Sequence, residues 1–130
     1  MIVAGIGCKR GASAADLHRV IDAALARAGL GREAIALIAA PAAKCAEPGV
    51  AAVAHTLCLL VVPVTQSDLE AAGRRAVTRS DRVAAMWNVP SVAEAAALAA
   101  GGPTARLLTP RVAVGPATCA LAERAELATP

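Results

Sequence analysis

A glycine-rich turn between an apolar strand and an amphipathic helix most limits how this chain can fold. Residues 2–6 are apolar and end against Gly7, a pattern typical of a short buried strand. Ser13 is the expected N-cap of a helix, because apolar side chains then recur at helical spacing until Gly29, a residue type that often ends helices. A strand, a tight turn and a helix in this order predict an α/β fold, in which helices cover the faces of a sheet.

The rest of the chain continues the alternation of strands and helices. The expected elements are strands at residues 34–40, 58–62, 106–109 and 117–122, and helices at residues 48–56, 67–72 and 91–101. The arginine-containing segment 73–81 is expected to form a loop, and residues 110–116 are expected to connect the last two strands. The predicted architecture is a three-layer α/β/α sandwich with a mostly parallel, mixed sheet and a C-terminal antiparallel hairpin.

Length and hydrophobic content favour one domain without a membrane segment. The chain has 130 residues, and we expect one domain at residues 1–123 and a tail at residues 124–130. Although 57% of the residues are hydrophobic, many are alanines, and no run approaches the ~20 strongly apolar residues of a membrane-spanning helix. Glycines and the basic pair Lys9 and Arg10 interrupt the N-terminus, so a signal peptide is not expected. We therefore expect a cytoplasmic protein.

Aromatic content and charge narrow the class of partner. The chain has one Trp and neither Tyr nor Phe, so it offers few platforms on which nucleic-acid bases could stack. Its net charge of +3 is too weak to indicate a DNA-binding surface. A mildly basic protein of this kind suits an acidic small molecule, and we expect no nucleic-acid partner.

The cysteines do not form a recognisable metal site. No C-x-x-C pair is present, and neither His18 nor His55 stands at ligand spacing beside a cysteine. Scattered cysteines in a cytosolic protein are usually small buried hydrophobic residues. We therefore expect no bound metal and no other cofactor. The four cysteines are Cys8, Cys45, Cys58 and Cys119.

The turn after the first strand is the best candidate for a binding site. In open α/β sheets, ligands bind beyond the carboxyl ends of the strands, where this turn lies. Glycines allow a ligand to approach the backbone, N–H groups at a helix start attract anions, and Lys9 and Arg10 add positive charge. This predicts a carboxylate or phosphate site, although the spacing matches neither a P-loop nor a dinucleotide motif. The alternative is a plain turn with two solvated cations.

Four further residues have two open interpretations each. Cys8 lies close to a helix N-terminus and two cations, which favour a thiolate, but no histidine is placed as its base, so it is either a nucleophile or a positioning residue. Glu47 is either a general base or a residue that serves the helix beginning at Pro48. Ser91 and Glu94 form a capping-box pattern and are otherwise candidate ligand contacts.

Four blocks of the sequence carry a resemblance to a known family. They are Gly-Ile-Gly-Cys-Lys-Arg-Gly at residues 5–11, Lys-Cys-Ala-Glu-Pro-Gly at 44–49, Val-Pro-Ser-Val-Ala-Glu-Ala-Ala-Ala-Leu at 89–98, and Leu-Leu-Thr-Pro-Arg at 107–111. In this order they resemble the CobE / CbiG C-terminal family of cobalamin biosynthesis. The resemblance extends over about residues 2–122, and it is greatest to the members that consist of this domain alone.

The resemblance implies a function in corrin-ring synthesis. Family members of the CbiG type open the lactone of cobalt-precorrin-5A and release acetaldehyde, whereas the activity of the stand-alone members is not well defined. We expect this chain to bind a precorrin-type tetrapyrrole, with a lactone hydrolase or an accessory partner of another pathway enzyme as alternatives. The candidate catalytic residues are Cys8 and Glu47. The candidate ligand-binding residues are Gly7, Cys8, Lys9, Arg10, Gly11, Ser13, Lys44, Glu47 and Ser91.

Overall fold

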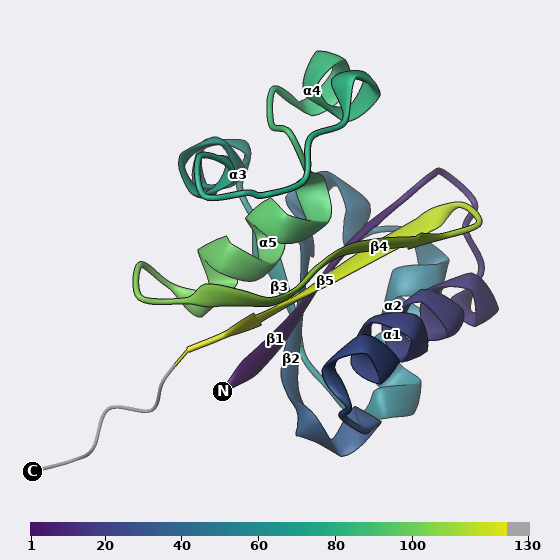
Figure 1. Ribbon diagram of the computed structural model, residues 1–130. Helices are drawn as coiled ribbons and strands as arrows, with labels where there is room; N and C mark the ends of the chain where they lie inside the picture. The colour runs from purple at the N-terminus through teal and green to yellow at the C-terminus, as the bar shows by residue number, and fades with distance from the viewer. Residues whose placement is uncertain (125–130) are drawn as a thin grey trace, which may run out of the picture.

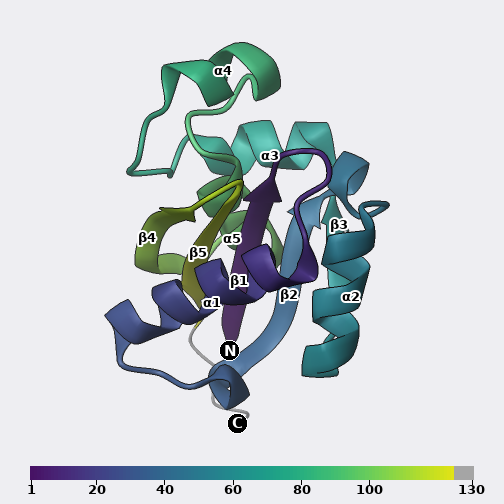
Figure 2. The same ribbon diagram turned by 90° about the vertical axis from the view of Figure 1, so that its right-hand side faces the viewer.

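The computed structural model of the protein describes residues 1–124 and shows a five-stranded mixed sheet with helices on both faces (Figure 1, Figure 2). The strands are β1 (Ile2–Cys8), β2 (Ile35–Pro41), β3 (Val61–Val64), β4 (Arg106–Val114) and β5 (Ala117–Glu123). The helices are α1 (Ala14–Ala28), α2 (Pro48–Leu57), α3 (Gln66–Gly73), α4 (Asp81–Trp87) and α5 (Val92–Gly101), with short 3-10 turns at Arg32–Ala34 and Ala42–Lys44. Apart from Arg124, the tail predicted at residues 124–130 lies outside the described residues.

The sheet confirms the predicted fold class. Its strand order is β3-β2-β1-β5-β4, in which β1, β2 and β3 are parallel and β5 runs antiparallel to both β1 and β4. Helices α1 and α2 lie on one face, and α3 and α5 lie on the other (Figure 2). Three parallel strands with a C-terminal hairpin added beside β1 therefore make a three-layer α/β/α arrangement.

The prediction for the third strand was wrong in its position. Cys58 adopts a left-handed conformation (φ 56°) as the C-cap of α2, so it ends a helix instead of beginning a strand. β3 starts only at Val61 and continues through Pro63, which was expected to end it. Proline is tolerated here because β3 is an edge strand, and one of its sides needs no backbone N–H.

The final hairpin has a tighter turn than predicted. β4 extends to Val114, so residues 110–114 belong to the strand and not to the connection. Gly115 has a positive φ of 57°, which suits the short turn into β5. Pro110 is accommodated because β4 is the other edge strand and its register against β5 is irregular near this residue.

Helix α4 was not predicted. The hydroxyl oxygen of Ser80 accepts a hydrogen bond from the Val83 N–H at 3.3 Å, and Asn88 ends the helix in a left-handed conformation (φ 58°). Every residue of α4 keeps some exposure, and only Val83 and Trp87 pack at the margin of a core cluster. A helix with so few buried residues has no apolar stripe, which is why periodicity does not reveal it.

α5 packs on β1 at very short range. A Cβ atom at Gly5 would lie 2.2 Å from the carbonyl oxygen of Ala93 and 2.7 Å from the Cβ of Ala97, so the strand needs glycine at this position. Ala93, Ala95, Ala96 and Ala97 are fully buried. Much of the alanine in the chain therefore serves close packing between a helix and the sheet.

The apolar helices are not membrane spans by length. Within residues 1–124, no single helix is long and apolar enough to cross a membrane. α4 and α5 satisfy that test only together, as a pair bent by 61°, and the first seven positions of α5 are buried in the core of this fold.

Glu94 forms only half of the predicted capping box. The Ser91 hydroxyl oxygen accepts from the Glu94 N–H at 3.4 Å, which confirms the N-cap. The fully buried carboxylate of Glu94 points elsewhere: Oε1 accepts from the backbone N–H groups of Val77 (2.7 Å) and Thr78 (3.0 Å), and Oε2 from that of Arg111 (2.8 Å). One side chain thus connects α5 to the loop before α4 and to β4.

Arg75 holds the same loop at its other end. We call residues 74–80 the strap. The guanidinium of Arg75 donates to carbonyl oxygens around the C-terminus of α5, including those of Ala105 at 3.0 Å and Gly102 at 3.3 Å. The strap has no regular secondary structure, as predicted for this segment, and it is fixed to α5 at two points.

Replacing Glu94 by glutamine is expected to destabilise the fold. The substitution puts an NH2 group opposite a backbone N–H, and loss of a hydrogen bond to a charged acceptor costs about 1.5–3 kcal/mol. We expect the free energy of unfolding to fall by about 2–4 kcal/mol in urea denaturation. Glu33→Gln, at an exposed position, is the matched control, with an expected change within about 0.5 kcal/mol. Equal effects at the two positions would contradict the proposed connection.

Alanine substitutions at two glycines of β1 should lower the stability of the fold by very different amounts. At Gly5 the atoms met by a new Cβ belong to the α5 backbone, so Gly5→Ala is expected to lose about 3 kcal/mol or more of stability. At Gly7 the nearest atom is the Thr118 hydroxyl oxygen at 2.8 Å, which is able to rotate away, so Gly7→Ala is expected to lose about 1 kcal/mol. Thermal and urea unfolding measure both, and a milder effect at Gly5 would show that α5 is less tightly seated.

Candidate functional site

The candidate site lies at the edge of the sheet where the three parallel strands end. α1, α2 and α3 each begin after one of these strands, so their N-termini share that edge (Figure 1). α5 runs opposite to β1, since Val92 contacts the position of Gly7 and Ala97 contacts that of Gly5. The N-terminus of α5 therefore joins the others at this edge.

The turn after β1 is held firmly while its cations face solvent. The Lys9 N–H donates to the Pro116 carbonyl oxygen at 2.9 Å, and the Ala12 N–H donates to the Lys9 carbonyl oxygen at 3.1 Å. On the other side, a Cβ at Gly49 would lie 2.3 Å from the Ala12 carbonyl oxygen, so α2 packs directly on the turn. Lys9 and Arg10 are exposed. The backbone is thus preorganised, and the two positive side chains remain available.

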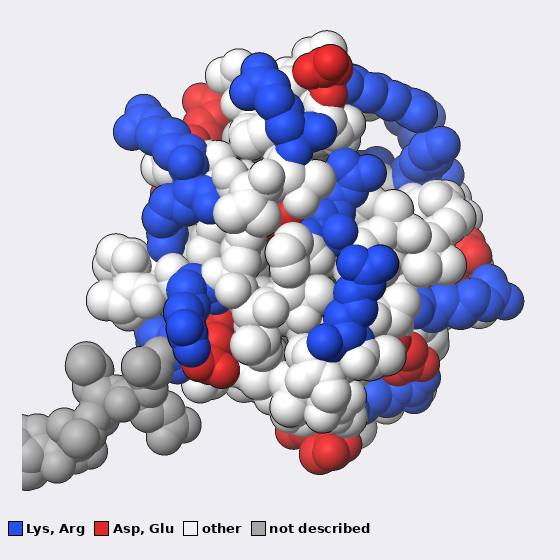
Figure 3. Space-filling view, viewed as in Figure 1, with Lys and Arg blue, Asp and Glu red and all other residues white. Residues whose placement is uncertain are grey.

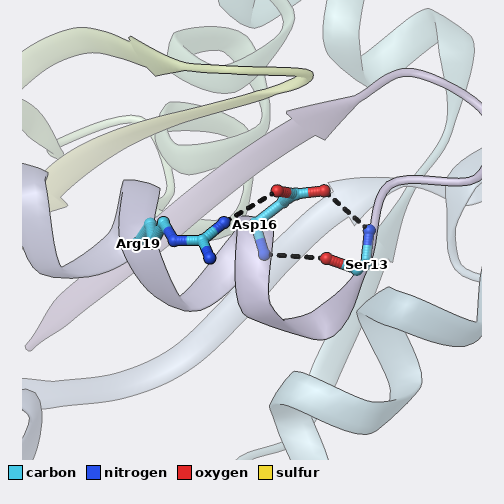
Figure 4. Close-up of polar contacts among 3 residues, drawn as sticks. All are labelled: Ser13, Asp16 and Arg19. Carbon is cyan, nitrogen blue, oxygen red and sulfur yellow. Dashed lines mark hydrogen bonds and ion pairs between the residues drawn. The ribbon is translucent and has the colours of Figure 1, made fainter.

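The start of α1 is occupied by its own capping box. Figure 4 shows the Ser13 N–H donating to Asp16 Oδ2 at 3.0 Å and the Asp16 N–H donating to Ser13 Oγ at 3.1 Å. The hydrogen bond from the Ser13 backbone N–H is the main cause that lowers the pKa of the Asp16 carboxyl, which also pairs with Arg19 Nη1 at 3.1 Å. The N–H groups of Lys9, Ala12 and Ser13 therefore have acceptors within the protein and are not available to an anion, contrary to the expectation for this turn. The side chains of Lys9 and Arg10 remain exposed.

Cys8, Lys44 and Glu47 come together between the ends of β1 and β2. Lys44 Nζ lies 3.9 Å from Glu47 Oε1, and their side chains are only 20% and 17% exposed. Glu47 is the N-cap residue of α2, but its side chain makes no capping hydrogen bond. Its carboxylate lies near Lys44 and close enough to Cys8 to affect the pKa of that thiol.

The environment of Cys8 does not favour a thiolate. Burial raises the pKa of the Cys8 thiol, Lys44 partly opposes this, and Glu47 reinforces it. The expectation that helix and cations activate this thiol is therefore wrong, because desolvation and a nearby carboxylate outweigh them. Cys8 at the end of β1 fits a positioning role better than a nucleophilic one.

Ser91 is fully buried, with its hydroxyl engaged as the N-cap of α5. A ligand would reach this hydroxyl only after displacing the Glu94 N–H. Of the other predicted ligand residues, Lys9, Arg10, Gly11 and Ser13 are exposed, Lys44 and Glu47 are half-buried, and Gly7 is buried.

The remaining cysteines lie in different environments. Burial raises the pKa of the Cys119 thiol to about 12 and also raises that of Cys45, whose thiol donates to the Pro41 carbonyl oxygen at 3.5 Å. Cys58 is exposed, contrary to the expectation that these cysteines are buried. Among residues 1–124, no three His, Cys, Asp or Glu side chains gather in a way that would hold a metal ion.

Sequence comparison places the chain among proteins of one pathway. It matches the model of the family described as "Cobalamin synthesis G C-terminus" over residues 2–122. Protein CobE of Sinorhizobium sp is 32% identical over 126 residues, which cover 97% of this chain and 82% of that protein.

Solved structures agree with the sequence comparison. The crystal structure of CobE, a protein from the cobalamin (vitamin B12) biosynthetic pathway, gives a TM-score of 0.87 at 32% identity and covers 94% of this chain and 89% of that one. Cobalamin biosynthesis protein chiG from Agrobacterium tumefaciens str. C58 gives a TM-score of 0.76 at 34% identity, and the match covers 97% of this chain and 100% of that one. A cobalamin biosynthesis protein G homolog from Sulfolobus solfataricus gives 0.69 at 24% identity, over 94% of this chain and 36% of that one, and shows likeness of fold.

These similarities show that the protein is one of the α/β domains of cobalamin biosynthesis, and its sheet is the one described above. The chain belongs to the CbiG C-terminal family and is a cobalamin biosynthesis protein of the CobE/CbiG type.

Substitutions at Glu47 and Lys44 should shift the reactivity of Cys8 in opposite directions. Glu47 raises the pKa of the Cys8 thiol, so Glu47→Gln is expected to lower it and increase the thiolate fraction at a given alkaline pH. Lys44→Met is expected to do the reverse. Iodoacetamide labelling, resolved for each cysteine by mass spectrometry, measures the rates, with exposed Cys58 as internal reference. If the labelling rate of Cys8 changed in the same direction in both variants, Glu47 and Lys44 would not act on this thiol as described.

Proposed function

We propose that this protein binds a corrinoid precursor, a tetrapyrrole of the precorrin type, at the edge formed by the ends of β1 and β2. The observation that carries the proposal is the set of three cations there: exposed Lys9 and Arg10 on a rigid turn, and half-buried Lys44 beside it. Such a ligand carries acetate and propionate carboxylates around an apolar ring. Membership of a cobalamin biosynthesis family supports this class of ligand.

Cationic side chains on a fixed backbone suit recognition of carboxylates. An arginine–carboxylate contact is charge-assisted and is able to form two parallel hydrogen bonds. The turn is held by the β4–β5 hairpin and by α2, so little ordering would be required when a ligand binds. Lys44 already has Glu47 as a partner, which leaves Lys9 and Arg10 as the main source of attraction.

The environments of Cys8 and Glu47, the two candidate catalytic residues, favour ligand binding over catalysis. Burial and Glu47 raise the pKa of the Cys8 thiol, and the Glu47 carboxylate is paired with Lys44. A protein that holds an intermediate would also need to release it to another enzyme of the pathway, and we propose such an enzyme as its protein partner.

The double variant Lys9→Ala/Arg10→Ala is expected to weaken tetrapyrrole binding. Loss of two charge-assisted contacts should raise the Kd roughly tenfold or more, since about 1.4 kcal/mol corresponds to a factor of ten. Titration of the full chain with precorrin-type intermediates, followed by absorption spectra, measures the affinity, which should also fall with added salt. The control is Arg27→Ala/Arg106→Ala, which removes the same charge at exposed positions near the opposite edge of the sheet. Unchanged affinity in the Lys9/Arg10 variant would remove the site assignment.

A hydrolase acting on the lactone of precorrin-5A or its cobalt form is the second candidate. The observation that favours it is the contact of Glu47 with Lys44 beside Cys8, because a carboxylate there could act as a general base. Acetaldehyde release from a lactone-bearing precorrin, abolished in Glu47→Gln, would support this activity. No release at stoichiometric protein would leave the binding function alone.

A further inference from the structure

A second basic region lies on the other side of the N-terminus of α5. It surrounds a groove of about 530 Å³ between α3, the strap and α4. Its lining includes Glu70, Gly73, Arg74, Thr78, Arg79 and Asn88. A volume of this size is within the range of small-molecule sites, roughly 300–1,000 Å³. Nothing in the site described above uses it.

The wall of this groove is preformed. The strap is bonded through Arg75 to the C-terminal end of α5 and through the Val77 and Thr78 N–H groups to the buried Glu94 carboxylate. At the floor, Gly73 approaches Val89 so closely that a Cβ would lie 3.0 Å from its Cγ1. The backbone therefore keeps the groove open by contacts within the protein.

The charges that face the groove favour an anion. Among residues 1–124, Arg74 has no carboxylate within ion-pair distance. Arg79 pairs with Asp81 at 3.9 Å, between side chains that are 76% and 100% exposed, which is a weak surface pair. The one carboxylate in the lining, Glu70, accepts a hydrogen bond from Gln66 Nε2 at 2.9 Å.

The groove and the cationic turn flank the same end of α5. Pro90 lines the groove, and Val92, two residues later, packs against Gly7 at the end of β1. Figure 3 shows lysine and arginine side chains over the upper part of the molecule, in the region of α3 and α4, and others lower on the same face, with a few acidic side chains among them. Positive charge is thus presented on both sides of one short segment.

We infer that this groove is a second carboxylate subsite, which takes an acetate or propionate arm of the same ring-shaped ligand. The inference rests on the proposed function, and it assigns roles to residues outside the Lys9–Arg10 turn. Arg74 and Arg79 bind the carboxylate, while Val77 and Pro90 provide apolar surface for the adjoining edge of the ring. The groove is too small for a whole macrocycle, so the ring lies across the N-terminus of α5.

The test uses cobyrinic acid, a corrin with free acetate and propionate carboxylates, and its heptamethyl ester as probes. In the full chain, Arg74→Gln/Arg79→Gln is expected to raise the Kd for the acid about tenfold and to leave binding of the uncharged ester unchanged. Asn88→Asp places a carboxylate in the lining and keeps a residue type that tolerates the left-handed backbone. This variant should weaken binding of the acid in the same way. Arg27→Gln/Arg106→Gln removes two exposed charges outside the groove lining and near the opposite edge of the sheet, and is the matched control.

The possible outcomes separate the two proposals. If the acid binds and only the Lys9/Arg10 variant binds it more weakly, the groove is not a subsite and the inference is overturned. The proposed function stands in that case. If only the groove variants weaken binding, the subsite stands and the turn loses its role. If the wild-type chain binds neither probe at millimolar concentration, both proposals fail. Circular dichroism of each variant confirms that the comparison is made between folded proteins.

Discussion

The close approach of α5 to β1 is the constraint on which the rest of the structure depends. The helix reaches the strand only because Gly5 has no side chain and the facing residues, Ala93 and Ala97, are small. This contact determines where the first turn of α5 lies, since Val92 then packs over Gly7 at the end of β1. The high alanine content, which by itself resembles that of a membrane protein, is thus explained as a requirement of helix–sheet packing in this domain.

The position of α5 also determines which contacts hold the strap in place. A buried carboxylate is costly unless it is hydrogen-bonded, and Glu94 satisfies this with three backbone N–H groups from two other segments. The strap has little apolar surface to bury, because Val77 is largely exposed, so polar contacts through Arg75 and Glu94 replace hydrophobic packing. A loop fixed in this way forms one wall of a groove without requiring a ligand to order it.

Local patterns predicted those features whose partners are near in sequence. The capping box of Ser13 and Asp16 is present because both groups lie in one helical turn. Glu94 shows the same local pattern, but its carboxylate binds N–H groups seventeen residues away in both directions, which no local rule reveals. Pro63 and Pro110 likewise mark strand ends by propensity, whereas each lies within an edge strand, and edge position follows from the sheet order alone.

The same distinction applies to the site. A strand followed by a turn and a helix places Lys9 and Arg10 at the ligand-binding edge of an α/β sheet, and the structure leaves both exposed there. The raised pKa of the Cys8 thiol depends on burial and on residues that follow β2, so it was not predictable. An edge rich in cations but without an activated nucleophile is suited to recognition by charge. The corrin precursor that we propose as ligand carries carboxylates in several directions around its ring, so a single turn would contact only one side of it. Cations on both sides of the N-terminus of α5 would match that distribution of charge.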